Sequence, residues 1–151
     1  MVDKTDLKIL KLLQSEGRIS NADLATRIAL SPSATHTRVK QLEAAGILKS
    51  YAAIIDRHAL GFGQSAFVKI TLESQGKDAI DAFESAVVEH DEIVECYLMS
   101  GEYDYLLHII VRDSNAYEAI HRRVLTTLPR VARLTSSFAL RTVRGQHPLP
   151  L

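Results

Sequence analysis

The sequence contains one cysteine, Cys96, in 151 residues. A single cysteine excludes an internal disulfide and any zinc site built from several thiolates. The histidines show no metal-ligand spacing with carboxylates or with Cys96; they are His36, His58, His90, His108, His121 and His147. Gly61 and Gly63 form too short a pattern for a phosphate-binding loop. The sequence therefore predicts neither a metal nor a cofactor.

Long apolar runs are also missing, since none reaches the roughly 18 residues that a membrane helix needs. The first ten residues, MVDKTDLKIL, carry acidic side chains and lack the apolar centre of a signal peptide. We therefore expect a cytoplasmic protein with no membrane partner. A hydrophobic content of 46% and a charged content of 24% are ordinary for a soluble globular protein. The length suits one large domain or two small ones.

The chain has a formal net charge of zero, but its two halves carry net charges of opposite sign. Residues 1–50 hold eight Lys and Arg against five Asp and Glu, a net charge of +3. Residues 65–151 hold nine against twelve, a net charge of −3. This asymmetry indicates two halves with different partners, and the basic half is the one suited to nucleic acid.

The basic half begins with three predicted helices, over residues 3–15, 21–29 and 32–45. The third starts at a helix-initiating pair, Ser31 and Pro32, and stops at Gly46. Only two or three residues separate the second helix from the third, as in a helix-turn-helix. Residues 47–56 have strand character and predict a wing strand, and residues 57–64 read as a linker.

From Ser65 onward the apolar period changes, and the elements alternate differently. The pattern predicts strands over 66–73, 92–100, 105–112 and 133–143, and helices over 76–90 and 114–128. The order β-α-β-β-α-β is typical of a ferredoxin-like fold. Residues 105–111 of the third strand are apolar on both faces except at His108, whereas two helices cover only one face of a sheet. We therefore expect a second copy of the chain to cover the other face, giving a dimer.

The third helix carries one stripe of polar side chains at helical spacing, Ser33, His36, Thr37 and Lys40. Arg38 lies at its border, while Thr35, Val39 and Leu42 face the predicted core. Hydroxyl, imidazole and cationic groups bind phosphate oxygens and base edges in a major groove. The alternative is an ordinary solvated face, and a further alternative is a head that binds a protein instead of DNA. The tight turn and the basic half favour DNA.

Two features of the second half carry possible chemistry. In the turn SGEYDY (100–105), Gly101 permits unusual backbone geometry, and Asp104 is a carboxylate among apolar strands. Such a carboxylate serves either as a turn or ion-pair residue or as a ligand contact. Cys96 and His108 lie on neighbouring predicted strands and could approach each other, but no third orienting group accompanies them. We therefore predict that the chain is not an enzyme.

A set of motifs follows in a fixed order along the chain. The first are D-xx-IL-xx-L from Asp6, GRISNADLATRIALSPS and RVKQLEAAGILKSY, and the later ones are ALGFG, SGEYDYLLHIIV, TSSFAL and the final LPL. In these motifs the chain resembles the Lrp/AsnC family of feast/famine transcriptional regulators. Together the motifs span essentially the whole chain. The resemblance implies an α+β protein with an N-terminal winged helix-turn-helix followed by a ferredoxin-like βαββαβ ligand-sensing domain. The boundaries are 1–50 for the DNA-binding domain, 51–64 for the wing strand and linker, 65–144 for the sensing domain and 145–151 for the tail.

The resemblance also implies partners and sites. It implies binding to double-stranded DNA, an amino acid as effector, and assembly into dimers or into octamers built as tetramers of dimers. The candidate DNA contacts are Ser31, Ser33, His36, Thr37, Arg38 and Lys40. The candidate effector contacts are Met99, Gly101, Tyr103, Asp104, Thr135, Ser136 and Ser137.

Some positions depart from the family pattern. A cation is frequent where this chain has Thr37 and Gln41, an apolar residue is common at Thr35, and a turn glycine is common at Ala29. With fewer cations on the third helix, we expect each single head to bind DNA weakly. Several heads acting together would offset that weakness.

Overall fold

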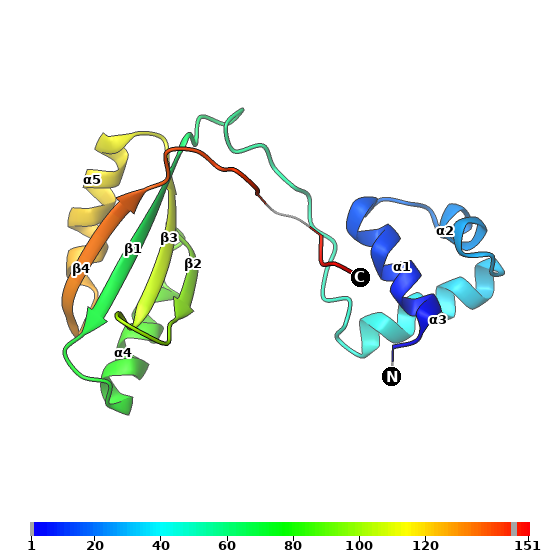
Figure 1. Ribbon diagram of the computed structural model, residues 1–151, viewed down its shortest axis with the longest axis horizontal. Coiled ribbons are helices and arrows are strands. Elements are labelled where there is room, and N and C mark those ends of the chain that lie inside the picture. The colour runs from blue at the N-terminus through cyan, green and yellow to red at the C-terminus, as the bar shows by residue number, and fades with distance from the viewer. Residues whose placement is uncertain (1, 146–147) are drawn as a thin grey trace. The chain divides into compact units, whose positions relative to one another are not determined.

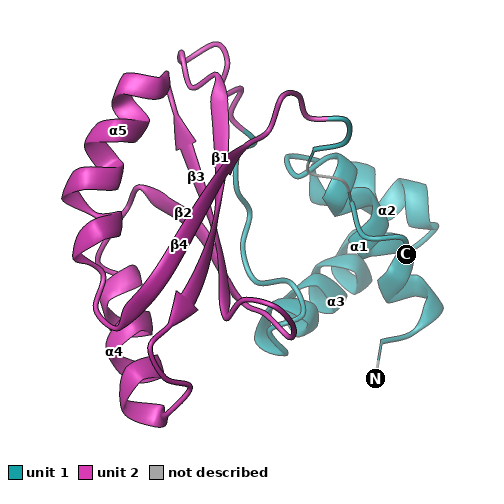
Figure 2. Ribbon diagram, turned by 60° about the vertical axis from the view of Figure 1, so that its left-hand side comes forward, with its two compact units in different colours: residues 1–54, 143–151 teal, residues 55–142 magenta. Residues whose placement is uncertain are grey.

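The computed structural model describes residues 2–145 and 148–151, and the chain divides into two compact units. One unit, called the head, comprises residues 1–54 and 143–151; the other, called the sheet unit, comprises residues 55–142 (Figure 2). The division falls inside the segment predicted as the wing strand and linker. It also assigns the predicted tail to the head, which the sequence did not indicate.

The head contains three helices, α1 (Lys4–Ser15), α2 (Asn21–Ile28) and α3 (Pro32–Ala44) (Figure 1). Each begins at a side-chain cap, since Asp3, Ser20 and Ser31 accept hydrogen bonds from free backbone N–H groups of the first turn. Their apolar faces meet in a small core of buried residues, Ile9, Leu24, Ile28 and Leu42. Thr35 is buried as expected, and its hydroxyl donates to Ser31 O at 3.0 Å.

The turn between α2 and α3 contains a residue in an unfavourable backbone region. Ala29 has φ +57° and ψ +46°, the left-handed conformation in which a Cβ is crowded. Gly46, after α3, adopts a similar φ of +68° without that crowding. Position 29, where the resemblance leads us to expect glycine, therefore has a backbone conformation that glycine adopts with less strain than alanine.

The predicted wing strand over 47–56 is wrong as a strand. Residues 51–56 have no regular secondary structure, and the large apolar side chains Tyr51, Ile54 and Ile55 are mostly exposed. The residue types favour a strand, but a strand forms only where a neighbouring strand pairs with its N–H and C=O groups. The propensity of residues 47–56 does not show whether such a neighbour exists.

The sheet unit contains β1 (Gln64–Leu72), α4 (Lys77–Val87), β2 (Ile93–Leu98), β3 (Tyr105–Val111), α5 (Ser114–Arg123) and β4 (Val131–Phe138). The strands pair antiparallel in the order β2-β3-β1-β4. Both helices cover the same face of the sheet (Figure 2). This is the ferredoxin-like arrangement predicted from the element order.

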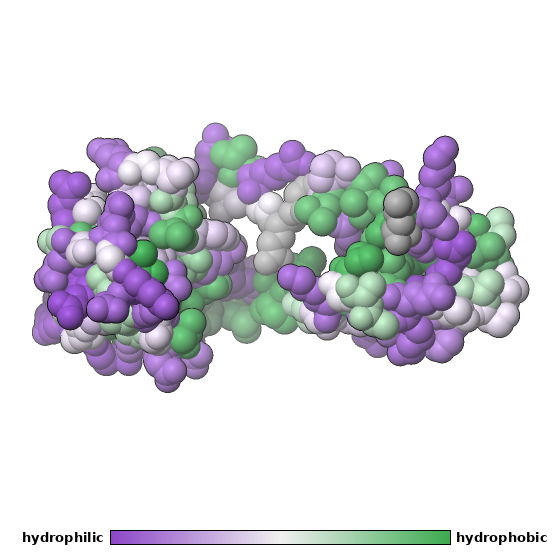
Figure 3. Space-filling view, turned by 90° about the horizontal axis from the view of Figure 1, so that it is seen from below, coloured by the Kyte–Doolittle hydropathy of each residue, from purple (hydrophilic) through white to green (hydrophobic). Residues whose placement is uncertain are grey.

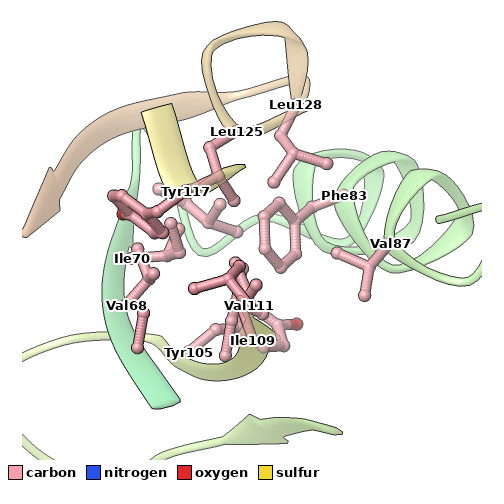
Figure 4. Close-up of a cluster of buried hydrophobic side chains, with 13 residues drawn as sticks. Val68, Ile70, Phe83, Val87, Tyr105, Ile109, Val111, Tyr117, Leu125 and Leu128 are labelled. Atoms are coloured by element: carbon pink, nitrogen blue, oxygen red, sulfur yellow. The ribbon is translucent and has the colours of Figure 1, made fainter. Parts of the chain in front are cut away.

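The covered face holds the larger core. Alternate residues of β1 and β3 point into it, and Phe83 of α4 and Leu125 pack against them (Figure 4). At its edge Tyr105 is 1% exposed, and its hydroxyl donates to Glu84 Oε1 at 2.7 Å. Burial, followed by this carboxylate contact, raises the pKa of Tyr105 above its ordinary value. The tyrosine therefore remains a neutral donor throughout the usual pH range.

The helix predicted over 114–128 is shorter than expected. α5 ends at Arg123, and a 3₁₀ turn, η1 (Leu125–Thr127), follows it. The hydroxyls of Thr126 and Thr127 bond back to the carbonyls of Arg122 and Arg123. Such local hydroxyl bonds compete with regular helix continuation. The apolar period alone does not reveal that competition.

Candidate nucleic-acid interface and ligand site

The polar stripe of α3 is exposed, as its spacing predicted. Ser33, His36, Thr37 and Lys40 all lie at the solvent-facing side of the helix, whereas Thr35 and Leu42 are buried. The α2–α3 turn in front of it is fixed by the amide of Asn21, which donates to Pro32 O at 2.9 Å. Sequence reasoning missed this role of Asn21, although its position at the start of α2 is a usual one for a local backbone contact.

The two cations of α3 already have acidic partners. Arg38 Nη1 contacts Asp3 at 2.7 Å and Asp6 at 2.8 Å, which joins α3 to the start of α1. These two hydrogen bonds raise the pKa of Arg38. Lys40 Nζ contacts Glu43 at 2.8 Å and lowers the pKa of that carboxyl. The helix therefore presents less unpaired positive charge than its sequence suggests.

The other polar residues on this side of α3 differ in which of their hydrogen-bonding groups remain available for DNA. The hydroxyls of Ser31 and Ser33 lie 3.2 Å apart, and that of Thr37 donates to Ser33 O at 3.0 Å. His36 has no hydrogen-bond partner among the residues that the structure describes. The free groups of this face are thus the imidazole of His36, hydroxyl lone pairs and the backbone N–H of Ser33, because Ser31 already accepts from the N–H groups of Ala34 and Thr35. All three suit phosphate oxygens or base edges.

Asp104, the candidate acid of the ligand site, is engaged by its own chain. Its carboxylate accepts hydrogen bonds from Leu72 N at 2.7 Å and from Gln75 Nε2 at 2.8 Å. Its backbone N–H donates to Ile70 O, and its carbonyl accepts from Met99 N. Of the two alternatives drawn from the sequence, this geometry is that of a turn-forming residue. Gly101, at the tip of the same turn, has a φ of +142°, which glycine tolerates best.

The three hydroxyl residues of β4 are not brought together. Thr135 and Ser137 pair with Lys69 and Phe67 and share the uncovered face of the sheet. Ser136 points to the helix-covered side, where its hydroxyl bonds to that of Tyr117. Because side chains alternate along a strand, Ser136 cannot contact the same ligand as Thr135 and Ser137 on the uncovered face. The prediction that all three residues bind the effector together is therefore wrong for Ser136.

A small hollow on the uncovered face collects charges of both signs. Its volume is about 210 Å³, and it is lined by Lys69, Thr71, Glu102, Tyr103, Arg133 and Thr135. The ammonium of Lys69 lies 4.9 Å from the centre of the Tyr103 ring. Only Tyr103 and Thr135 were predicted from the sequence. The other four were missed, although alternation along β1 and β4 would have placed Lys69, Thr71 and Arg133 on one face once the strands were known to be neighbours.

Cys96 and His108 do not approach each other. Cys96 pairs with Leu107 and shares the helix-covered side, whereas His108 lies on the uncovered face. There His108 Nδ1 lies 2.8 Å from Glu95 Oε2, and its Nε2 lies 3.0 Å from Ser65 Oγ. The order of carboxylate, imidazole and hydroxyl matches that of a hydrolytic triad.

Two further observations argue for a structural role of this group. Ser65 is only 5% exposed, and its hydroxyl also receives a hydrogen bond from Arg57. The imidazole of His108 stacks on Phe67, with ring centres 4.6 Å apart and an angle of 9° between the planes. The hydroxyl is thus enclosed and already bonded, so this group ties the linker to the sheet.

Among the described residues, no group of three or more His, Cys, Asp and Glu is placed to hold a metal ion. Within the same residues, no helix is both long enough and apolar enough to span a membrane.

Comparison with protein families gives two matches along the chain. Residues 2–49 match a winged helix-turn-helix DNA-binding model, and residues 65–149 match the Lrp/AsnC ligand binding domain. The first corresponds to the three helices of the head, and the second contains the whole of the four-stranded sheet.

Curated relatives match over nearly the full length. The chain is 38% identical over 150 residues to the Bkd operon transcriptional regulator of Pseudomonas aeruginosa, covering 99% of this chain and 98% of the relative. It is 41% identical over 148 residues to the leucine-responsive regulatory protein of Escherichia coli, covering 98% and 90%. These relatives are transcriptional regulators rather than enzymes.

Solved structures agree with this. A transcriptional regulator from Neisseria meningitidis, solved as an L-Met complex, superposes with a TM-score of 0.93 at 38% identity, covering 99% of this chain and 97% of that one. An AsnC family regulator from Agrobacterium tumefaciens gives a TM-score of 0.92 at 32% identity, covering 98% and 96%.

Proposed function

The chain belongs to the Lrp/AsnC family and is a helix-turn-helix transcriptional regulator with a ligand-binding domain, and we propose that the exposed face of α3 is its DNA-reading surface. The observation that carries this proposal is the exposure of Ser33, His36, Thr37 and Lys40 on one side of a helix whose other side is buried. In this mode α3 enters the major groove, α2 crosses the backbone, and two heads meet half-sites about one helical turn apart.

The ion pairs of α3 favour modest affinity per head. Arg38 and Lys40 are each held by acidic groups of the same unit, so DNA must compete with Asp3, Asp6 and Glu43 for them. Assembly of several heads multiplies the contacts and offsets this.

The DNA-binding proposal is tested by titrating labelled upstream DNA of the chain's own gene with Lys40→Ala. We expect weaker binding and a slope of log affinity against log salt reduced by about one, because one phosphate contact is lost. Lys77→Ala removes the same charge from the sheet unit and serves as the matched control. A salt-independent affinity of the unmodified chain, or equal losses in both variants, would contradict the proposal.

For the ligand site, we propose that the hollow lined by Lys69, Glu102 and Arg133 holds an amino acid effector. Its cations suit an α-carboxylate, and the Glu102 carboxylate suits an α-ammonium. Glu102 has no hydrogen-bond or ion-pair partner among the described residues, unlike Asp104. Thr71, Tyr103 and Thr135 supply the remaining lining. The carboxylate proposed to meet the ammonium is therefore Glu102 and not Asp104, the candidate taken from the sequence.

This assignment is tested by calorimetric titration of the common amino acids against Glu102→Gln. We expect loss of effector binding with an unchanged melting temperature, because Glu102 supports no internal contact. Glu89→Gln, which neutralises another exposed carboxylate of the sheet unit, should bind as the unmodified chain does. Normal effector binding by Glu102→Gln would refute the placement.

Assembly is the third part of the proposal. The uncovered face of the sheet carries the half-buried residues Phe67, Leu106 and Ile110, and the exposed ring of Tyr97. We propose that a second copy covers this face, and that dimers associate further into octamers. An effector regulates such a protein by favouring one assembly or one head spacing over another. Light scattering at micromolar concentration should show at least a dimer, and Tyr97→Asp should shift it toward monomer.

A further inference from the structure

The chain passes between the two units twice. It leaves the head after residue 54, and it returns to the head at residue 143. The final described segment, Pro148–Leu151, lies against α1, with the C mark beside that helix in Figure 1. We call Pro148–Leu151 the strap.

One side chain of α1 holds the strap through both polar groups of one peptide residue. The N–H of Leu149 donates to Gln14 Oε1 at 2.7 Å, and Gln14 Nε2 donates to Leu149 O at 3.4 Å. Leu151 N then donates to Leu149 O at 2.9 Å, which folds the strap into a turn. An amide is the neutral side chain that offers a donor and an acceptor side by side, so Gln14 replaces the pairing that a neighbouring strand would give.

The strap also forms one wall of an apolar hollow of the head, about 800 Å³ in volume. The other walls are the apolar side of α1, including Leu10 and Leu13, and residues 47–54. In Figure 3 apolar residues gather as a patch on the head among hydrophilic ones. Leu151 is 41% exposed here, whereas Leu140, between β4 and the strap, is 100% exposed. Apolar contact and the paired hydrogen bonds therefore act at the same place.

These contacts connect the two proposed sites. β4 carries Arg133 and Thr135 of the ligand hollow, and the chain runs from its end to the strap. The strap bonds to Gln14 on α1, and the start of α1 bonds through Asp3 and Asp6 to Arg38 on α3. The linker after α3 is the only other covalent connection between the head and the sheet unit.

We propose that the strap is a second tether, which fixes the DNA-binding head to the last strand of the ligand-binding unit. With the strap docked, the head is held at two points and loses less orientational freedom on binding DNA. With the strap released, only the linker holds it. Movement of β4 on effector binding then reaches α3 through α1. The inference rests on the proposed function for its consequence at DNA, but the docking of the strap can be measured without DNA.

The first experiment measures the docking. Amide hydrogen exchange of Leu149 in the full chain should be slow, and Gln14→Ala should accelerate it about tenfold, as expected for loss of a side-chain hydrogen bond. Equal exchange in both proteins would overturn the proposed docking. Leu140→Asp, which alters a fully exposed residue before the strap, is the matched control and should leave the exchange of Leu149 unchanged.

The second experiment measures the consequence by fluorescence anisotropy with labelled operator DNA. Gln14→Ala, which removes the hydrogen bonds to the strap, and Leu151→Asp, which removes its apolar contact, should each weaken DNA binding by about threefold to tenfold. The double variant should be no weaker than either, because both release the same tether. Unchanged affinity, or additive losses, would overturn the tether. If the unmodified chain binds no DNA while Leu149 is protected, the proposed function fails and the docking stands.

Discussion

The two units of this protein bury their apolar side chains to very different extents. The head has a core cluster of four buried residues, whereas that of the sheet unit has thirteen. A small core leaves little surplus over the conformational entropy of the ordered chain. The head should therefore depend more on its caps, its ion pairs and the strap than the sheet unit depends on its own polar contacts. The unit that contains the helix-turn-helix is thus the one with the smaller buried core.

The largest effect expected from this difference is a core truncation in the head. Leu24 is 2% exposed, and Leu24→Ala should cost about 2–5 kcal/mol of the free energy of unfolding. That loss should unfold the head alone, while calorimetry still shows the transition of the sheet unit. Leu140→Ala, at a fully exposed position, should change neither transition. Simultaneous loss of both transitions would show that the units are not independent.

A smaller effect is expected in the sheet unit from Asp104→Ala. The change removes the acceptor of Leu72 N and of Gln75 Nε2, and should cost about 1–3 kcal/mol because Leu72 N lies partly buried. Urea unfolding measures it. Glu102→Gln, two residues away, should leave the midpoint unchanged. Equal midpoints for the unmodified chain and Asp104→Ala would remove the structural role given to this carboxylate.

The turn of the head offers a stabilising change. Ala29→Gly should raise the free energy of unfolding of the head by about 1 kcal/mol, because it relieves the positive φ of +57°. Gly46→Ala, at φ +68°, is the mirror control and should lower it by a similar amount. Thermal unfolding measures both variants. Only the transition of the head should shift, and the melting temperature of the sheet unit should stay the same.

The smallest effect is a pH dependence confined to the head. The Asp6 backbone N–H, followed by the Arg38 guanidinium, lowers the pKa of Asp3 below its ordinary 3.8. A carboxyl with a lowered folded-state pKa adds stability above its unfolded pKa, and that stability is lost as the pH falls through the folded value. The melting temperature of the head should thus decrease below about pH 4. Asp3→Asn, which still caps α1, should flatten this decrease.

The sequence was a good guide wherever one chain segment determines its own structure. The polar stripe of α3 and the buried Thr35 followed from helical spacing, and the β-α-β-β-α-β order followed from the change of period. Thr135 and Ser137 share one face of β4 and Ser136 lies on the other, as the alternation of side chains along a strand requires. Motif order identified the family, which the comparisons with relatives over nearly the whole chain confirmed.

Other features depend on which segments become neighbours. Lys69 and Arg133 enter the ligand hollow because β1 lies beside β4, and Arg38 loses its freedom because α1 begins next to α3. Leu149 of the strap bonds to Gln14, which lies 135 positions earlier in the sequence. Residue types and periodicity predicted most of the helices and strands, and the order of the motifs indicated the family. Only the tertiary structure decided which charges are free, because hydrogen bonds and ion pairs form between groups that are close in space.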